Sequence, residues 1–409
     1  MPRSSSWLIF LVRCALFPSA PFSGETKARG NCLFTDDRNM RRTTVILTLA
    51  GALLLVFVFL QHSRPGALPS SADAELTSRD VAKEGPLPAA RLVSEAAAPP
   101  PAEMQPTTNC LLRLYRGEEV PPLRPEQVAA YLEANHRGVE SLLGAYRTTR
   151  DKALLQEAAE KYPNDPRVAF EAAFFGAPED RRKWLDAFKN SAPDNSLPDY
   201  LAASDYFKAG DKAHALEALQ SAAAKPDCQD YFADFVQNAT EAYRSAGYSE
   251  AEAKTLAASQ ALLPHLASLK QDGVGLVQLA QSYRDAGDSA SAQATLNLAL
   301  ELGARLNQPD SPTLIQMLVG IAVEKMALGA AEPGTPYGSG GQTAQRMLDA
   351  LNRQREALKA LTKPLDEAML TRMPEADLVS YRDRQLLFGA QSAIQWVLNK
   401  YPPAGSTAQ

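Results

Sequence analysis

Cysteine and histidine are scarce in this chain of 409 residues, which contains only four of each. The histidines are scattered and none pairs with another at the helical spacing used by zinc-binding motifs; they are His62, His136, His214 and His265. The cysteines show no metal-site spacing either. The sequence therefore predicts no metal centre and no cofactor held by these residue types.

Motifs of catalysis are also missing. The one glycine-rich cluster, at residues 338–341, has no preceding strand signal and no following Lys-Ser or Lys-Thr, which a phosphate-binding loop requires. No Gly-x-Ser-x-Gly elbow occurs. Acidic pairs such as Glu118-Glu119 and Glu179-Asp180 fall where we expect exposed helices. We expect no catalytic residue and no enzymatic activity, unless a site forms only from residues distant in sequence.

The charge of the chain is divided unevenly along its length. Residues 1–42 contain seven basic and three acidic side chains, whereas the rest of the chain contains 35 basic and 44 acidic ones. An acidic surface repels nucleic acid and anionic lipid headgroups. We therefore expect no nucleic-acid partner.

One long apolar run stands near the N-terminus. The segment from Thr43 to Leu60 contains no charged side chain. A helix of this length, with a rise of about 1.5 Å for each residue, would nearly cross a bilayer core. Arg38, Arg41 and Arg42 precede the run, and the basic flank of a membrane helix stays in the cytoplasm. The sequence predicts a single transmembrane helix over residues 43–60 with its N-terminus inside; the alternative is a cleaved signal peptide.

The segments around this run have different characters. Met40, followed by Arg41 and Arg42, resembles a natural start, so we interpret residues 1–42 as a cytoplasmic leader in which the part before Met40 is a gene-model extension. Residues 61–123 contain ten of the 29 prolines, eight of them between Pro65 and Pro106, and too few apolar residues to form a core. We expect a disordered tether there, holding the following domain about 40–45 Å from the membrane.

Beyond the tether we find no strand signal, and apolar residues recur at helical spacing. Residues 124–195 break into short segments separated by Pro, Asp and Asn, which is typical of stacked helical hairpins. The sequence thus predicts an all-α fold, a membrane helix followed by an α-solenoid of hairpins.

A short phrase occurs three times in residues 196–305. Each copy reads Tyr-x-x-Ala-Gly, and its glycines are Gly210, Gly247 and Gly287. The best copy consists of Leu279, Ala280, Tyr283, Gly287, Ala292, Leu296 and Ala299. This pattern resembles the tetratricopeptide repeat, in which glycine closes the turn between two helices and small residues let them pack closely. Asp199 and Glu252 depart from it, each standing where the family has an apolar or small residue.

The C-terminal part divides at a patternless loop. We expect a further helix over residues 306–328, a Gly/Pro loop over 329–342, a C-terminal helical hairpin over 343–400 and a disordered tail over 401–409. The second helix of the hairpin should begin at Pro374 and continue through Trp396. The hairpin is interpreted as a cap on the array. The alternative is a homodimerising coiled coil, for which the heptad run is short.

The resemblance implies a binding surface. In tetratricopeptide proteins the first helix of each unit lines a concave groove that holds a peptide. The matching positions here are Ser204, Phe207, Lys208, Gln237, Glu241, Arg244, Gln281, Arg284 and Asp285. Arginine and lysine at such points can clamp a carboxylate. The alternative is that these side chains are plain solvated helix faces.

Two cysteines, Cys110 and Cys228, lie in the part of the chain that we expect to be exported. In an oxidising compartment they can form one disulfide, and the alternative is two unpaired thiols. We therefore predict a single-pass protein of the cytoplasmic membrane, periplasmic in a Gram-negative organism, that scaffolds a protein or peptide partner. The alternatives are a structural spacer, a secreted binding module and an enzyme with a non-local site.

Overall fold

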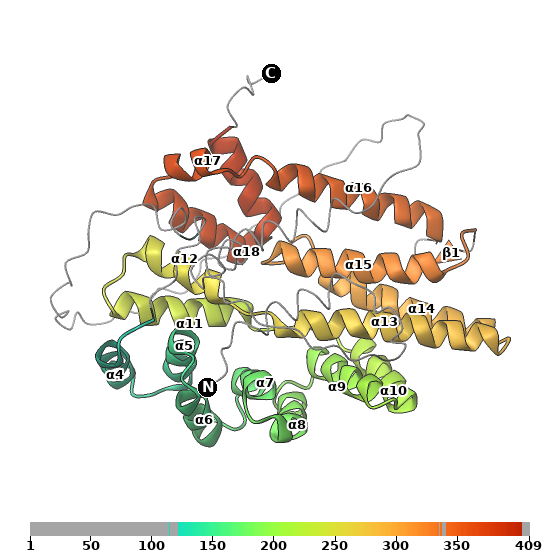
Figure 1. Ribbon diagram of the computed structural model, residues 1–409, viewed down its shortest axis with the longest axis horizontal. Helices are drawn as coiled ribbons and strands as arrows, with labels where there is room; N and C mark the ends of the chain where they lie inside the picture. Colours follow the sequence, from blue (N-terminus) through green and yellow to red (C-terminus); the bar gives the residue numbers. More distant parts are fainter. Residues whose placement is uncertain (1–113, 115–121, 335, 338–340, 403–409) are drawn as a thin grey trace, which may run out of the picture.

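The computed structural model describes residues 114, 122–334, 336–337 and 341–402, and these are mostly helical (Figure 1). The all-α class is confirmed at that level. The predicted membrane helix over residues 43–60 lies outside the described residues, together with the leader and most of the tether. None of the described helices is both long and apolar enough to cross a bilayer.

The N-terminal helices are short, as the Pro, Asp and Asn breaks predict. They are α4 (Pro125–Ala134), α5 (Val139–Thr149), α6 (Lys152–Lys161), α7 (Pro166–Phe175), the 3-10 turn η1 (Pro178–Asp180) and α8 (Arg181–Ser191). Aspartates cap two of them. The Asp151 carboxylate accepts the backbone N–H of Ala153, and the Asp165 carboxylate accepts that of Arg167. Such caps satisfy backbone donors that have no partner inside the helix.

The region with the repeated phrase forms three helical hairpins. Its helices are α9 (Leu197–Lys208), α10 (Lys212–Ala223), α11 (Phe232–Ser245), α12 (Glu250–Gln260), α13 (Pro264–Asp285) and α14 (Ser289–Leu306). Gly210, Gly247 and Gly287 lie in the turns with φ angles of 78°, 93° and 81°. A Cβ on any of them would meet nothing within 4 Å. Glycine is therefore needed for the left-handed backbone and not for space.

The C-terminal part is less regular than predicted. It contains α15 (Leu314–Ala330), β1 (Pro336–Tyr337), β2 (Gln342–Thr343), α16 (Ala344–Thr362), α17 (Glu367–Arg372) and α18 (Glu375–Lys400). The two strands pair antiparallel inside the segment that we predicted to be a plain loop. Tyr337 anchors this ribbon, since its ring is buried in the main core. Two-residue strands are too short to leave a periodic signal in the sequence.

Figure 1 shows the arrangement of these elements. Helices α13, α14, α15 and α16 run side by side along the long axis, and each contacts the next. The shorter helices α4–α10 lie at the bottom of Figure 1, with α5 against α11 and α9 against α13, whereas α18 contacts α12 and α16 at the opposite side.

One apolar core extends through most of the molecule, from Leu114 to Leu358. Leu114 and Leu123 belong to the segment predicted as a disordered tether, yet both are buried in this core. The folded region therefore begins before residue 124. The mostly apolar segment at residues 111–115 is too short to give a periodic signal, and Leu123 directly follows two prolines.

Candidate functional site

The residues of the predicted groove do not come together. Ser204 of α9 is buried, and its hydroxyl donates a hydrogen bond to the backbone carbonyl of Ser268 in α13 at 3.2 Å. The Phe207 ring packs on Gly275 of α13 so closely that a Cβ there would lie 2.9 Å from it. The prediction that Ser204 and Phe207 face a groove is therefore wrong: this face of α9 is a helix–helix contact. Lys208 is exposed at the end of α9.

The groove positions of α11 lie on an exposed face of a different part of the molecule. Gln237, Glu241 and Arg244 are exposed, and the Gln237 amide donates to the Glu241 carboxylate at 2.8 Å. Besides its hairpin partner α12, α11 packs mainly against α5. These side chains therefore do not continue the surface of α9.

The groove positions of α13 lie at the C-terminal end of that helix. Gln281 and Asp285 are exposed and hydrogen-bonded to each other at 2.8 Å, and Arg284 is half-buried. Because α9 packs on α13 while α11 packs on α5, the three first helices do not form a row in sequence order. The nine residues therefore do not line one groove.

Two glycines explain why the hairpins depart from sequence order. A Cβ on Gly144 of α5 would lie 2.5 Å from the carbonyl oxygen of Asn238 in α11, so this pair of helices touches backbone to backbone. Gly275 permits a similarly close contact between α13 and α9. Glycine at a helix crossing allows an approach that any side chain would block. Neither glycine belongs to the repeated phrase, so the phrase could not reveal which hairpins stack.

A buried ionic cluster lies under α11, which the sequence gave no reason to expect. Arg147 of α5 forms an ion pair with Glu171 of α7, and both side chains are almost fully enclosed. The guanidinium also lies 3.8 Å from the ring centroid of Phe235 in α11. Burial lowers the pKa of Arg147 to about 9. Because its members come from three helices, no local spacing could have found this cluster.

A carboxylate–imidazole pair adjoins this cluster. The His265 Nε2 atom lies 3.2 Å from an Asp230 carboxylate oxygen, and the imidazole packs edge-on against Phe170. Burial raises the pKa of Asp230, but the hydrogen bond from His265 and its charge lower that pKa below its usual range. An acid–base pair of this kind can move a proton, but only where a substrate reaches it.

Another buried carboxylate explains a departure from the repeat pattern. Asp199 stands where the tetratricopeptide family has an apolar residue, and it is fully buried at the start of α9. Lys189 and Lys225 lie 2.5 Å and 2.6 Å from its two oxygens, and the Ser221 hydroxyl donates to it at 3.3 Å. The Asp199 carboxylate therefore links α8, α9 and the end of α10 through its ion pairs and hydrogen bond.

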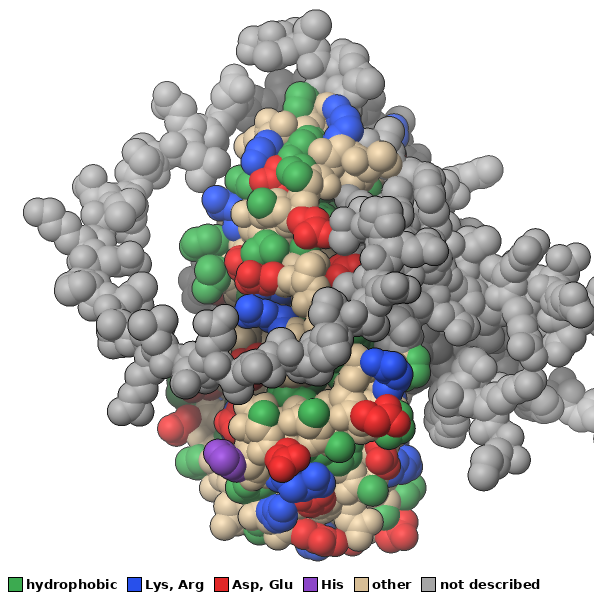
Figure 2. Space-filling model, turned by 90° about the vertical axis from the view of Figure 1, so that its left-hand side faces the viewer, with side chains coloured by type: hydrophobic (Ala, Val, Ile, Leu, Met, Phe, Trp, Pro, Cys, Tyr) green, Lys and Arg blue, Asp and Glu red, His purple; other side chains and the backbone are tan. Residues whose placement is uncertain are grey.

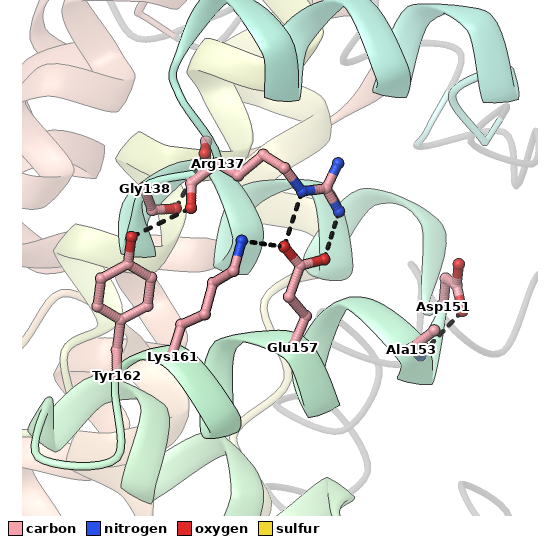
Figure 3. A network of polar contacts seen from close by, with 8 residues as sticks. Arg137, Gly138, Asp151, Ala153, Glu157, Lys161 and Tyr162 are labelled. Carbon is pink, nitrogen blue, oxygen red and sulfur yellow. Dashed lines mark hydrogen bonds and ion pairs between the residues drawn. The ribbon is translucent and has the colours of Figure 1, made fainter.

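Ion pairs at the surface also link neighbouring helices. Figure 3 shows Glu157 of α6 held between Arg137, at 2.7 Å from its Nε, and Lys161, also at 2.7 Å. The hydrogen bond from Arg137 lowers the pKa of Glu157 to about 2. The Tyr162 hydroxyl donates to the Arg137 carbonyl at 3.2 Å, which fixes the start of α5 against the end of α6.

Two of the hollows on the described surface adjoin elements of the candidate site. One, of about 560 Å³, is wide and open and lies between α8 and the turn before α7; it is lined by Asn164, Lys183, Asp186, Ala187, Asn190 and Ser191. The other is a narrow crevice of about 20 Å³ among α11, α12 and α18. Neither is lined by the ionic cluster or by the His265–Asp230 pair. These buried groups therefore face neither of these two hollows.

The crevice does include one predicted groove residue. Gln237 lines it together with Lys254 of α12 and Asp383 of α18, which form an ion pair at 2.6 Å. Leu386 closes its apolar side. The crevice is large enough for one water molecule and too small for a peptide side chain.

The helix α18 is in fact a hairpin. Its backbone breaks at Gly389, where φ is 84° and ψ is 162°. Asp377 near its start accepts a hydrogen bond from Lys400 near its end at 2.6 Å, and Arg384 lies over the Trp396 ring at 4.9 Å. In a straight helix the first two residues would lie roughly 35 Å apart along the axis. The prediction of one continuous helix after residue 374 is therefore wrong.

The turn of this hairpin is pressed against the α14–α15 connection. A Cβ on Gly389 would lie 2.7 Å from the Asp310 backbone, and the Ala390 N–H donates to the Ser311 carbonyl at 2.9 Å. The Gln385 amide donates to the Pro312 carbonyl at 2.9 Å. These contacts hold the turn in place although it projects to the surface.

Large apolar side chains are exposed around this turn. In the part of the chain that the structure describes, the exposed ones are Leu262, Ile315, Leu387 and Phe388, with Leu387 71% and Phe388 54% accessible. Ile315 follows the connection that holds the turn, and Leu262 adjoins Leu263, which packs in the same small cluster as Leu386. We call Leu387 and Phe388, which directly precede the turn at Gly389, the apolar tip.

The structure describes one of the two cysteines in the predicted disulfide. Cys228 is the one free cysteine among the described residues, and burial raises the pKa of its thiol. Its disulfide with Cys110 stays a prediction, since Cys110 lies outside the described residues. In the described ranges no three His, Cys, Asp or Glu side chains converge as metal ligands.

Comparison of this chain with protein-family models, with curated proteins and with solved structures finds no match.

Proposed function

We propose that this chain is a membrane-tethered scaffold that binds another polypeptide at the apolar tip of the α18 hairpin. The observation that supports this is the exposure of the adjacent side chains Leu387 and Phe388 beside one fixed turn. Contiguous exposed apolar side chains mark interaction surfaces, whereas single ones are ordinary. The tip takes the place of the groove inferred from the repeat pattern.

The rest of the described molecule supports a binding role over a catalytic one. Its buried charged groups are closed off by helices and face neither hollow. The resemblance of residues 196–305 to tetratricopeptide repeats is part of the proposal, because hairpin arrays of that family hold other proteins.

The surface charge also favours a protein partner. On the side drawn in Figure 2, the Lys and Arg side chains of the described residues are interspersed with Asp and Glu. A nucleic-acid interface needs a basic patch or stripe. The apolar run from Thr43 to Leu60 remains the proposed anchor in the cytoplasmic membrane, with the helical domain outside the cytoplasm.

The proposal is tested by affinity capture with the full chain from detergent-solubilised native membranes. Three baits are compared: the unchanged chain, the double variant Leu387→Asp with Phe388→Asp, and the variant Arg244→Glu, whose charge change lies on the exposed face of α11. We expect a polypeptide retained by the first and third baits to be lost from the second. Identical captures with all three, or none, would overturn the proposal in favour of a structural spacer.

A further inference from the structure

We infer that the contact between α9 and α13 is a pH-sensitive latch, closed while the Asp272 carboxyl of α13 carries its proton and loosened when that proton is lost. The latch is independent of the proposed function, because it lies in the body of the helical domain and not at the apolar tip. Three features of the structure support it: the burial of the carboxyl, the closeness of the helix contacts around it and the lack of a counter-charge.

The Asp272 carboxyl is completely enclosed, with an exposed fraction of 0%. Among the described residues, neither of its oxygens has a hydrogen-bond partner. The Ser204 hydroxyl, which acts on this carboxyl from α9, has one proton and donates it to the Ser268 carbonyl. Burying an ionised carboxylate without a partner costs far more free energy than burying the protonated acid. The protonated form of Asp272 therefore fits this position and the ionised form does not.

Two glycines near Asp272 make the surrounding helix contacts close. A Cβ on Gly273 would lie 2.9 Å from the Val323 side chain of α15. A Cβ on Gly275 would likewise lie 2.9 Å from the Phe207 ring of α9. Glycine permits α13 to approach both neighbours in this way. Close packing on both sides leaves the carboxyl in surroundings of low dielectric constant, where an unpaired charge is most costly.

The charged side chains of α9 do not neutralise Asp272. Lys208 lies 3.4 Å from the Asp205 carboxylate, and the charges of these two residues act on Asp272 in opposite directions. Tyr200 of the same helix also lies within range of the Asp272 charge. Burial raises the pKa of Asp272 well above its usual value of 3.8, although Ser204 and Lys208 lower it in part.

The other two helices that pack on α13 direct their charged groups elsewhere, in the part of the chain that the structure describes. On α15, the Glu324 carboxylate accepts a hydrogen bond from Asn307 at 3.5 Å. On α14, Arg305 forms an ion pair with Glu301 at 3.0 Å. An ionised Asp272 would therefore have to reach water to be stabilised, which requires the α9–α13 contact to open.

The part that responds is the hairpin of α9 and α10, which lies below α13 in Figure 1. The Asp199 carboxylate pairs with Lys189 of α8 and with Lys225 after α10, so the hairpin keeps its own contacts as it loosens from α13. Opening would expose the Phe207 ring and the face of α13 at Gly275. The domain would therefore present a different surface at high pH than at low pH.

The direction of the pH effect follows from the two states of the carboxyl. In the open state Asp272 is hydrated and ionises near its usual pKa of 3.8, whereas in the closed state it keeps its proton to a higher pH. The closed state therefore has its full stability below about pH 4 and loses it as pH rises towards the raised pKa. Each pH unit in this interval lowers the ratio of closed to open molecules about tenfold.

The experiment is hydrogen exchange of the full chain in detergent at several values from about pH 5 to about pH 8, with rates corrected for intrinsic exchange. We expect the protection of the α9 amides to fall about tenfold for each pH unit over part of this range. The protection of the α11 amides should change much less. An equal pH dependence in α9 and α11 would overturn the latch, because the whole domain would then be responding.

The variant Asp272→Asn tests the carboxyl itself, because it keeps the shape of the side chain and removes the titration. Protection of α9 in this variant should no longer depend on pH. The matched control is Glu324→Gln, which removes another buried carboxyl with a raised pKa and should leave the pH dependence of α9 in place.

Two results would overturn the latch: α9 protection that is independent of pH in the unchanged chain, or the same pH dependence in Asp272→Asn. The first needs no variant, so it is obtained even if Asp272→Asn fails to fold. Neither result alters the capture expected at the apolar tip, so the latch and the proposed function fail separately.

Discussion

The ionic cluster under α11 and the apolar tip of α18 show opposite arrangements of side chains. The cluster encloses Arg147 and Glu171 in the core as a pair, whereas the tip leaves Leu387 and Phe388 in solvent. Burying a charge costs free energy unless it is paired, and exposing large apolar side chains costs free energy unless something covers them.

The difference between the two regions indicates their roles. The polar groups of the cluster are enclosed by α5, α7 and α11 and contact one another, so they stabilise the packing of helices that are distant in sequence. The apolar tip contributes little to the fold, since its side chains are mostly outside the core. Substitutions should therefore affect stability at the cluster and association at the tip.

The largest effect is expected at the cluster. Glu171→Ala would leave Arg147 buried without a counter-charge, which costs about 3–5 kcal/mol of unfolding free energy. Denaturant unfolding of the full chain in detergent measures it. The matched control is Glu157→Ala, which removes a surface pair and should cost less than about 1 kcal/mol.

A second variant checks the reason for that loss. Replacing both partners, Arg147→Met with Glu171→Leu, removes the buried charges together and should recover most of the stability. If the double variant is as unstable as Glu171→Ala, the unpaired charge is not the cause of the lost stability. The contrast between the ionic cluster and the apolar tip would then fail.

A smaller effect is expected where the tip joins the fold. Gly389→Ala places a methyl group 2.7 Å from the Asp310 backbone at a φ of 84°, which L side chains rarely adopt. We expect a loss of about 2 kcal/mol from overpacking and backbone strain. Hydrogen exchange should show faster opening of α18 than of α11. Equal protection in the variant and the unchanged chain would show that the turn does not depend on this contact.

The sequence predicted the elements well and their neighbours poorly. Breaks at Pro, Asp and Asn predicted the short helices of residues 124–195, such as α4, α6 and α7, because caps and breakers act locally. The stacking of α11 on α5 depends on Gly144 approaching Asn238, which is far away in the sequence. No single sequence reveals such a pairing, so the predicted groove, which assumed neighbours in order, was wrong.

The apolar tip could not be predicted from the sequence for the same reason, because it depends on a contact between residues distant in sequence. Gly389 looks like one more small residue within an apolar helix, and only the Asp310 backbone beside it explains the hairpin turn. Leu387 and Phe388 fit the helical pattern of a core-facing segment equally well. Their exposure follows from the turn, which removes them from the face that the rest of α18 buries.

The smallest effect is expected at Glu324 of α15, where the repeat helices meet the C-terminal part. Asn307, which follows α14 directly, donates to this carboxylate at 3.5 Å and also bonds to Gln354 of α16, which links the repeat helices to the C-terminal part. Burial raises the pKa of Glu324 to about 7, with Asn307 opposing it. A raised folded-state pKa stabilises the fold below the unfolded pKa of about 4.5, and this stability is lost as pH rises through 7.

Glu324→Gln should therefore be more stable than the unchanged chain at pH 8, by about 1–2 kcal/mol after allowance for partial exposure. The advantage should disappear towards pH 4.5, where the carboxyl is protonated in both states. Unfolding free energies measured at several values from pH 4.5 to pH 8 give the difference directly. A difference that does not change with pH would mean that the native carboxyl titrates normally. The link between the repeat helices and the C-terminal part would then carry no buried charge, and its stability would depend on the amide contacts of Asn307 and Gln354.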